Sequence, residues 1–322
     1  MEGSDTMEKV KIYIDGQEGT TGLKIVERFN GRDDIELLRI DEDKRKDPDE
    51  RKKFINASDF TFLCLPDAAS IEAVSMVENP NVRIIDASTA HRTNSQWAYG
   101  FPELSREFRN KIKNSKRVAV PGCYASGFNS IVYPLVKEGI FAPYQYVTSY
   151  AVSGYSGAGK KGIAQYEDEN RAKEFDAPRM YALAQNHKHL KEMQAISGLS
   201  YPPMFNPMVC DYYAGMIVAV PIVRRTLAKR TSIKEIHEVL KNHYKGEHFV
   251  KVMSLGGEEE LPNGFMTANA LEGTNNMQIF VSGNDEQILV CSRLDNLGKG
   301  ASGAAVQCLN IMMGIDEKTG LE

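Results

Sequence analysis

The first 120 residues alternate short apolar segments with segments of helical pattern, and this alternation is the strongest constraint on the fold. The expected strands are 10–14, 35–40, 60–65, 82–86 and 118–120. The helices expected between them are 20–29, 48–56 and 68–77. Short strands that are apolar on both faces and alternate with helices predict a doubly wound parallel sheet.

After residue 145 the pattern changes to longer strands, which are expected at 144–157, 213–223, 277–283 and 287–294. A helix is expected in 231–246, beginning with a capping box of Ser232 and Glu235 and ending at Gly246. This region therefore predicts an α+β catalytic and oligomerisation domain with a mostly antiparallel or mixed sheet.

The last segment is a glycine-broken loop that leads into a helix of small residues, which suits close packing against the first domain. A chain of 322 residues also exceeds the ~250–300 residues of one core. We therefore predict two domains, 1–122 with 295–322, and 123–294.

Composition excludes several classes of protein. The formal charge of -4 gives no basic field for nucleic acid, and no apolar run approaches the ~18 residues of a membrane span. The five cysteines are scattered, without a CxxC pair, which argues against a disulfide framework or a zinc finger. The N-terminus lacks a signal-peptide pattern, so we expect a cytoplasmic protein.

The first loop of the alternating region, "GQEGTTG", places Gly16, Gly19 and Gly22 between a strand and a helix, with Thr20 and Thr21 among them. Glycines here let backbone N–H groups approach a pyrophosphate at a helix N-terminus. The spacing is GxxGxxG rather than GxGxxG, and a plain tight turn is the alternative. The position after the first strand favours a Rossmann-like dinucleotide site.

The end of the second strand indicates which dinucleotide binds. Arg39 stands there, with Lys44 and Arg45 close after it, and guanidinium groups suit a 2′-phosphate. We therefore expect NADPH or NADP, while Asp41 keeps NADH open as a ribose ligand.

Cys123 in "VPGCYASGF" follows a strand and a Pro-Gly bend, and it begins a segment of helical spacing. The first turn of a helix stabilises a thiolate, so we expect a nucleophile with a lowered pKa. Cys64, Cys291 and Cys308 stand in apolar runs and are expected to be packed side chains, whereas Cys210 stays undecided.

A thiolate nucleophile needs an acid or base partner, and "NHKHLKE" offers His187 and His189, with Glu192 after them. We choose His187 as the acid and base, with His189 and Glu192 orienting it or the substrate. An HxH pair also suits a metal, but no third group of ligands is visible, so no metal is expected.

Two further loops are candidate anion sites. "DASTAHR" follows a strand and offers Ser88 and Arg92, and "SGYSGAGKKG" is a glycine-rich bend with Ser153, Ser156 and Lys160. Each can also be a plain polar loop. Beside a cysteine and a dinucleotide loop, they favour a small phosphate-bearing substrate.

Together these residues resemble a known family. The motifs, in order over most of the chain, are "GQEGTTG", "CLPDAAS", "DASTAHR", "YGFPEL", "PGCYASGF", "VSGYSGAGKK", "HKHLKEM" and "DNLGKGASGAAVQ". They resemble the N-acetyl-gamma-glutamyl-phosphate reductases of the shorter type that carries the GTTG loop. One departure is "CYAS", where the family has Cys-Tyr-Pro-Thr.

The resemblance implies NADPH-dependent reduction of an acyl phosphate to a semialdehyde through a Cys123 thioester, in arginine biosynthesis. It also implies cofactor contacts from Ser156, Gly157, Asn296 and Lys299, and a homodimer or homotetramer formed through the second domain.

Related acyl-phosphate reductases, acting on aspartyl or carrier-bound aminoadipyl phosphate, are the nearest alternatives. A thiol hydrolase or acyltransferase would leave the glycine loop unexplained, and a non-catalytic NADP-binding regulator would not need the thiolate.

Overall fold

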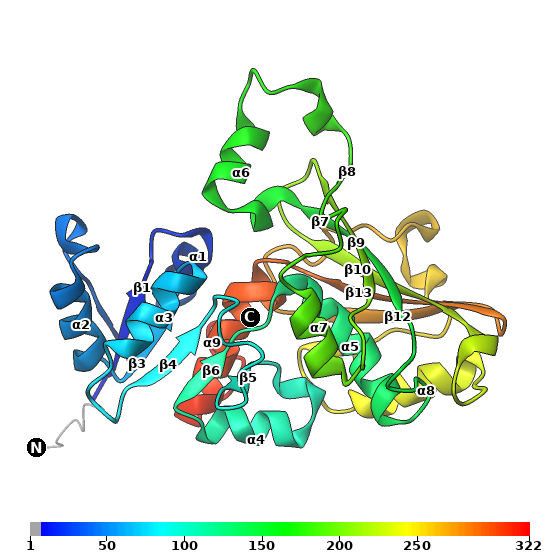
Figure 1. Cartoon of the computed structure of the whole chain (residues 1–322), viewed down its shortest axis with the longest axis horizontal. Helices are drawn as coiled ribbons and strands as arrows, with labels where there is room; N and C mark the ends of the chain where they lie inside the picture. The colour runs from blue at the N-terminus through cyan, green and yellow to red at the C-terminus, as the bar shows by residue number, and fades with distance from the viewer. Residues whose placement is uncertain (1–7) are drawn as a thin grey trace, which may run out of the picture.

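A computed structural model describes residues 8–322, so residues 1–7 of the first predicted domain lie outside the described residues. Within the described part, the N-terminal region forms a six-stranded sheet in the order β2-β1-β3-β4-β6-β5, with every neighbouring pair parallel (Figure 1). The strands are β1 (Val10–Asp15), β2 (Ile35–Leu38), β3 (Phe60–Leu63), β4 (Arg83–Asp86), β5 (Ala98–Tyr99) and β6 (Arg117–Ala119). The predicted doubly wound parallel sheet is confirmed.

Helices cover both faces of this sheet because successive strand residues point to opposite sides. Ile12 and Ile14 of β1 pack with α1 (Thr20–Arg28), α4 (Arg106–Asn114) and α9 (Gly303–Met313). Tyr13, between them, packs with α2 (Pro48–Ala57) and α3 (Asp67–Ser75) on the other face. The C-terminal helix α9 thus lies in the core of the first sheet, although the predicted boundaries at 122 and 295 stay a prediction.

The second region forms a mixed sheet, seven-stranded within residues 8–322, in the order β11-β12-β13-β10-β7-β9-β8. The β7–β9 and β11–β12 pairs are parallel and the other neighbours are antiparallel. Its strands are β7 (Thr148–Gly154), β8 (Arg179–Met180), β9 (Met204–Cys210), β10 (Met216–Val223), β11 (Val250–Val252), β12 (Met277–Gly283) and β13 (Gln287–Leu294). This confirms the predicted α+β region.

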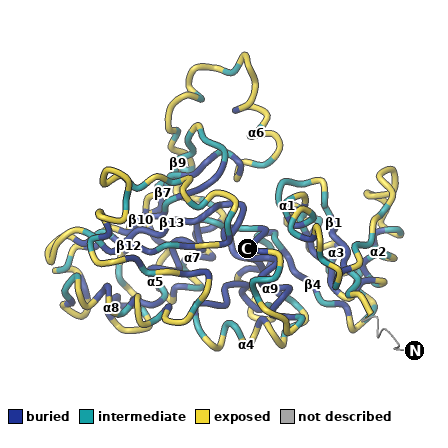
Figure 2. Tube along the Cα trace, turned by 180° about the vertical axis from the view of Figure 1, so that it is seen from behind, coloured by how far each residue is buried: buried dark blue, intermediate teal, exposed yellow. Residues whose placement is uncertain are grey.

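One face of the mixed sheet is covered by α5 (Cys123–Lys137), α7 (Leu190–Ser197) and α8 (Ile233–His243), which enclose the largest buried cluster (Figure 2). The predicted capping box of α8 is present, because Ser232 and Glu235 bond each other's backbone N–H groups. The helix ends at His243, before Gly246, which has a positive φ of 88°.

The segment that carries α6 (Gly159–Glu167) projects above the mixed sheet and returns through β8 (Figure 1). We call residues 155–183 the arm. Among the residues that the structure describes, no helix is long and apolar enough to cross a membrane.

Candidate active site

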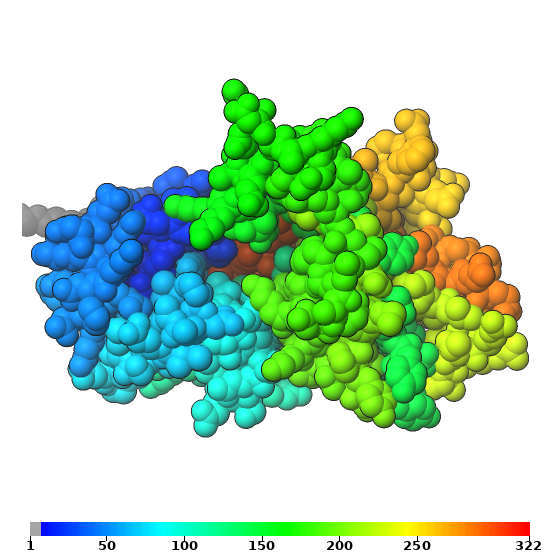
Figure 3. All heavy atoms as spheres, turned by 45° about the horizontal axis from the view of Figure 1, so that its top comes forward, coloured from blue at the N-terminus to red at the C-terminus, as the bar shows by residue number. Residues whose placement is uncertain are grey.

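A cavity of about 540 Å³ lies between the first sheet, the arm and the segment before α9. Figure 3 shows the surface hollowed between the N-terminal residues, in blue, and the green residues of the arm. Its walls include the start of α1, the ends of β3 and β6, the first turn of α5 and the end of β7. Ligands of open α/β sheets bind at this carboxyl edge.

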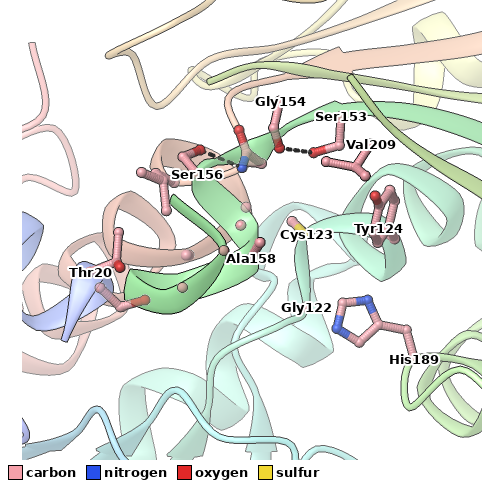
Figure 4. Close-up of a pocket in the computed structure, with 18 of the residues that line it drawn as sticks. Thr20, Gly122, Cys123, Tyr124, Ser153, Gly154, Ser156, Ala158, His189 and Val209 are labelled. Atoms are coloured by element: carbon pink, nitrogen blue, oxygen red, sulfur yellow. Dashed lines mark hydrogen bonds between the residues drawn. The ribbon is translucent and has the colours of Figure 1, made fainter. Parts of the chain in front are cut away.

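Cys123 is the first residue of α5, and its sulfur lies at the cavity wall (Figure 4). A Cβ added to Gly300 would lie 2.7 Å from the Cys123 Cβ, so a glycine is needed where the segment before α9 approaches the nucleophile. Sequence reasoning missed this contact, which only the fold creates.

Burial raises the pKa of the Cys123 thiol to about 11, although the Arg92 guanidinium and the backbone N–H of Tyr124 act in the opposite direction. The expectation from the sequence that the pKa of Cys123 is lowered is therefore wrong. The first turn of α5 is enclosed between the two regions of the chain, and loss of hydration outweighs the helix terminus.

The other cysteines divide in two groups. Cys291 and Cys308 are buried in hydrophobic clusters, as expected. Cys64 packs against the hydrophobic cluster of the first sheet, as expected, and it also lines the cavity. It follows β3 at the carboxyl edge of the sheet, where a side chain can face the ligand site.

The two histidines have different surroundings. The Gly122 backbone lies so close to the His189 ring and the Arg92 guanidinium that an added Cβ would overlap both. His189 is buried, and its Nδ1 has no hydrogen-bond partner within residues 8–322. The Nδ1 of His187 instead accepts a hydrogen bond from the His189 backbone N–H, at 3.1 Å.

Burial lowers the pKa of both imidazoles, that of His187 to about 4 and that of His189 well below its ordinary value. Lys188 adds to both effects, and Arg92 adds to that on His189. Both rings are therefore neutral at neutral pH.

Glu192 does not contact either histidine side chain through a hydrogen bond. Its carboxylate accepts from Arg92 Nη1 at 3.1 Å, from the Tyr99 hydroxyl at 2.7 Å and from the Gly122 backbone N–H at 2.8 Å. Glu192 therefore joins α7 to the bend that carries Cys123.

Arg92 lines this cavity and an adjoining one of about 320 Å³. Besides Glu192, it donates to the carbonyl oxygens of Val120 and Ala87. Its position beside the Gly122–Cys123 bend suits the predicted phosphate contact. Ser88 is not among the cavity residues, and its buried hydroxyl donates to Asp86 at 2.7 Å.

Ser153 does line the cavity, and its hydroxyl donates to the Gly154 carbonyl (Figure 4). Ser156, Gly157 and Asn296 lie together in the same wall. The Asn296 amide donates to the Ser156 hydroxyl at 2.8 Å and accepts from the Gly215 N–H at 2.8 Å.

Lys299 was expected as a cofactor contact, but it does not line the cavity. It is 2% exposed, and its ammonium donates to Glu103 and to Gln307 at 2.6 Å each. This expectation is corrected: the buried carboxylate holds the ammonium away from the ligand site.

The predicted dinucleotide loop reaches the cavity through Gly19, Thr20 and Thr21, and α1 has no acidic residue in its first turn. Gly16 has a φ of 84°, and a Cβ there would overlap the Cys64 carbonyl. A Cβ at Gly22 would lie 2.7 Å from the Gln17 Cα. The loop therefore needs these two glycines for its own tight folding, and it fits a dinucleotide phosphate at the exposed helix terminus.

Arg39 lies outside the cavity, on the exposed segment after β2. Lys44 and Arg45 form i,i+3 ion pairs with Asp41 and Glu42. Arg39 has no ion pair within the described residues, so its guanidinium remains available.

The cavity residues that sequence reasoning missed include Tyr124, Arg179 and Tyr181. The Tyr181 hydroxyl donates to the Tyr124 hydroxyl at 3.0 Å, and the Tyr124 ring packs against both His187 and His189. Tyr124 directly follows Cys123 and could have been noted for that reason. No signal marked Arg179 or Tyr181.

Within residues 8–322, no group of three or more His, Cys, Asp or Glu side chains could hold a metal ion.

Comparison with known proteins agrees with this arrangement. Residues 4–114 match the family described as semialdehyde dehydrogenase, NAD binding domain. Residues 123–296 match the family described as semialdehyde dehydrogenase, dimerisation domain. The expected nicotinamide dinucleotide cofactor is thereby confirmed.

Individual relatives carry a more specific name. The N-acetyl-gamma-glutamyl-phosphate reductase of Trichormus variabilis is 50% identical over 322 residues, covering 98% of this chain and 100% of the relative. That of Brucella ovis is 44% identical over 310 residues, covering 95% and 99%.

Solved structures share the fold. Aspartate semialdehyde dehydrogenase II of Vibrio cholerae, complexed with ASA, matches with a TM-score of 0.70 and 14% identity, covering 95% of this chain and 99% of the other. The Francisella tularensis enzyme matches with a TM-score of 0.71 and 15% identity, covering 94% and 100%. With its cavity, cysteine and dinucleotide loop, the chain belongs to the N-acetyl-gamma-glutamyl-phosphate reductase family, within the semialdehyde dehydrogenases.

Proposed function

We propose that this protein reduces N-acetyl-gamma-glutamyl phosphate to N-acetylglutamate 5-semialdehyde and phosphate with NADPH, in arginine biosynthesis. The observation that carries the proposal is the position of Cys123. It begins a helix at the wall of a cavity that also reaches a buried imidazole and the dinucleotide loop.

Cys123 attacks the acyl carbonyl, and the bond to the phosphate oxygen breaks to leave a thioester. The thiol must first lose its proton, because burial favours its neutral form. His189 is the acceptor that the geometry supports best, since its ring lies against Gly122 and is neutral at neutral pH. It replaces our sequence-based choice of His187.

Arg92 and Ser153 hold the departing phosphate. Arg92 is fixed by Glu192 and two backbone carbonyls, and a guanidinium with two remaining donors suits the paired oxygens of a phosphate.

When bound, NADPH supplies the hydride that brings the thioester to the aldehyde oxidation level. Gly19, Thr20 and Thr21 would hold its pyrophosphate, while Ser156, Gly157 and Asn296 would line the opposite wall. His189 returns a proton to the thiohemiacetal oxygen or sulfur as the aldehyde leaves and the thiol re-forms.

NADPH is preferred over NADH because Arg39, which has no ion pair within residues 8–322, lies near the end of β2, where the ribose of a Rossmann cofactor lies. Arg39→Ala is expected to narrow the preference by roughly ten- to a hundredfold, mainly by lowering kcat/KM for NADPH. Steady-state kinetics with both cofactors checks this, and a wild type that favours NADH would contradict it.

The protein assembles as a homodimer or homotetramer through the mixed sheet. The face opposite α5, α7 and α8 exposes Tyr150, Met204 and Val223, which are 39%, 59% and 41% exposed. Tyr150→Asp is expected to yield monomers in analytical ultracentrifugation, and an unchanged assembly would place the contact elsewhere.

We place the protein in the cytoplasm, a reducing compartment that suits the five free cysteines of the described chain.

The function is tested by assaying three semialdehydes side by side, those of N-acetylglutamate, aspartate and aminoadipate. In the oxidative direction, with NADP and phosphate, we expect kcat/KM to be highest for N-acetylglutamate semialdehyde. Higher kcat/KM with either alternative would assign this chain to a related acyl-phosphate reductase.

A further inference from the structure

Arg179 is an arginine of the arm that lines the cavity although the proposed chemistry does not use it. Its guanidinium carbon lies 3.8 Å from the Phe175 ring centroid and 4.9 Å from that of Tyr166. Its Nε donates to the Tyr166 hydroxyl at 3.2 Å. The Tyr166 ring in turn stacks on Tyr155, with centroids 4.6 Å apart. These aromatic contacts fix the guanidinium in place.

The charge of Arg179 has no counterpart in the part of the chain that the structure describes. Within residues 8–322, no carboxylate lies within 4.0 Å of it, and its two terminal nitrogens have no hydrogen-bond partner. No aspartate or glutamate in the described chain lines the cavity at all. Arg92, by contrast, is paired with Glu192 at 3.1 Å. An oriented, unpaired guanidinium in a cavity is suited to bind a carboxylate of the ligand.

The sheet register places Arg179 at a definite distance from Ser153, which lines the same cavity as Cys123. Ser153 of β7 lies opposite Val209 of β9, and Val209 lies opposite Arg179 of β8. All three residues line the cavity, and Figure 4 shows Ser153 and Val209 beside Cys123 and Tyr124. The backbones of Ser153 and Arg179 are thus two strand spacings apart, about 10 Å, before the long arginine side chain reaches inward.

This arrangement matches the ends of a glutamyl group. Three carbon atoms separate its reacting carbonyl carbon from its α-carboxylate, so the carboxylate extends from Cys123 along this row. The dinucleotide phosphates belong to the other end of the cavity, at Gly19 and Thr20. The row from Ser153 to Arg179 is therefore left for the acyl substrate.

We propose that Arg179 binds the α-carboxylate of the acyl substrate and thereby determines which acyl phosphates and semialdehydes the enzyme accepts. This inference rests on the proposed function. Because the carboxylate takes no part in bond making, the contact strengthens substrate binding in ground and transition states alike, and it acts mainly on KM.

The test compares N-acetylglutamate 5-semialdehyde with 4-acetamidobutanal, which is the same molecule without the α-carboxylate. Oxidation is measured with NADP and phosphate for the wild type and Arg179→Met, which keeps an apolar stem against Phe175. We expect the wild type to favour the carboxylated aldehyde by roughly 10- to 100-fold in kcat/KM. Arg179→Met should bring the ratio close to one by raising KM for that aldehyde alone.

Lys173→Met is the matched control, because it removes an exposed positive charge from the same arm at a residue outside the cavity. It should keep the wild-type ratio. An unchanged ratio in Arg179→Met, or an equal loss with both aldehydes, would overturn the assignment, since the second result means a structural role only. A wild type inactive on N-acetylglutamate semialdehyde would instead refute the proposed function itself.

Discussion

At the scale of a single side chain, two opposing effects act on the pKa of the Cys123 thiol. The helix N-terminus and Arg92 favour its thiolate, whereas burial favours its thiol, and burial prevails in raising the pKa to about 11. The reactivity of this nucleophile therefore depends on a neighbouring base rather than on a standing thiolate.

Alkylation by iodoacetamide measures this pKa. We expect the rate at Cys123 to rise about tenfold per pH unit from pH 7 to pH 10, because only the thiolate reacts and its fraction grows in that way below the pKa. Peptide mass spectrometry should find Cys123 labelled before Cys64, Cys291 and Cys308, whose pKa values burial also raises. A rate that is already constant at pH 7 would indicate a low-pKa thiolate.

Substitution distinguishes the catalytic roles of His187 and His189. His189→Asn is expected to lower kcat by roughly 10²–10⁴-fold, the usual contribution of a general acid and base. His187→Asn should lower it far less, because His187 supports the His189 backbone instead of facing Gly122. The pre-steady-state rate of thioester formation checks this, and a larger loss in His187→Asn would restore the sequence-based choice.

Residue identities in the site were partly predictable. Cys123 follows from a strand, a bend and a helical period, all of which are local. Its pKa is not predictable in this way, because burial depends on segments as distant as Gly300. Arg179 carries no sequence signal, since its role arises from aromatic rings of the arm and from the cavity opposite.

At the scale of elements, α5 and α7 meet through Glu192, whose carboxylate accepts from the bend before Cys123 and from Arg92. This carboxylate also raises the pKa of the Cys123 thiol, whereas Arg92 lowers it. Glu192 is therefore a positioning residue that holds both the nucleophile and the phosphate contact.

Glu192→Gln is expected to separate these effects. Loss of the negative charge lowers the thiol pKa, so iodoacetamide should react faster at pH 8, while turnover falls because Arg92 and Gly122 lose their common anchor. Loss of one partner from this buried pair should reduce the free energy of unfolding by about 3 kcal/mol.

The matched control is Glu138→Gln, an exposed glutamate at the other end of α5. Glu138→Gln should leave both the rate of alkylation at Cys123 and the turnover rate unchanged. Slower alkylation in Glu192→Gln would contradict the positioning role.

Elements with a strong local pattern were predictable, and those that depend on pairing were not. The capping box identified α8. β9 was missed because Pro207 interrupts its pattern, yet it pairs with β7 over its whole length. β5 and β8 have two residues each, too few to give a period.

At the scale of the whole molecule, the last helix of the chain, α9, packs in the core of the first sheet. The segment before α9 passes beside Cys123, contributes Asn296 to the cavity, and buries Lys299 against Glu103. The cavity is thus assembled from the beginning, the middle and the end of the sequence. The sequence motifs predicted many of the cavity residues, but only the fold shows that Lys299 faces away from the cavity.

The central claim is that Cys123 forms a thioester that exchanges with phosphate. The most direct measurement is the initial rate of NADP-dependent oxidation of N-acetylglutamate 5-semialdehyde against phosphate concentration, for the wild type, Arg92→Ala and Arg92→Lys. We predict that the wild-type rate saturates with phosphate and that Arg92→Ala requires a much higher phosphate concentration. Arg92→Lys should recover little of this loss, because a lysine ammonium lacks the paired N–H donors of a guanidinium. Full wild-type turnover without phosphate or arsenate would contradict the account, because water would then release the thioester.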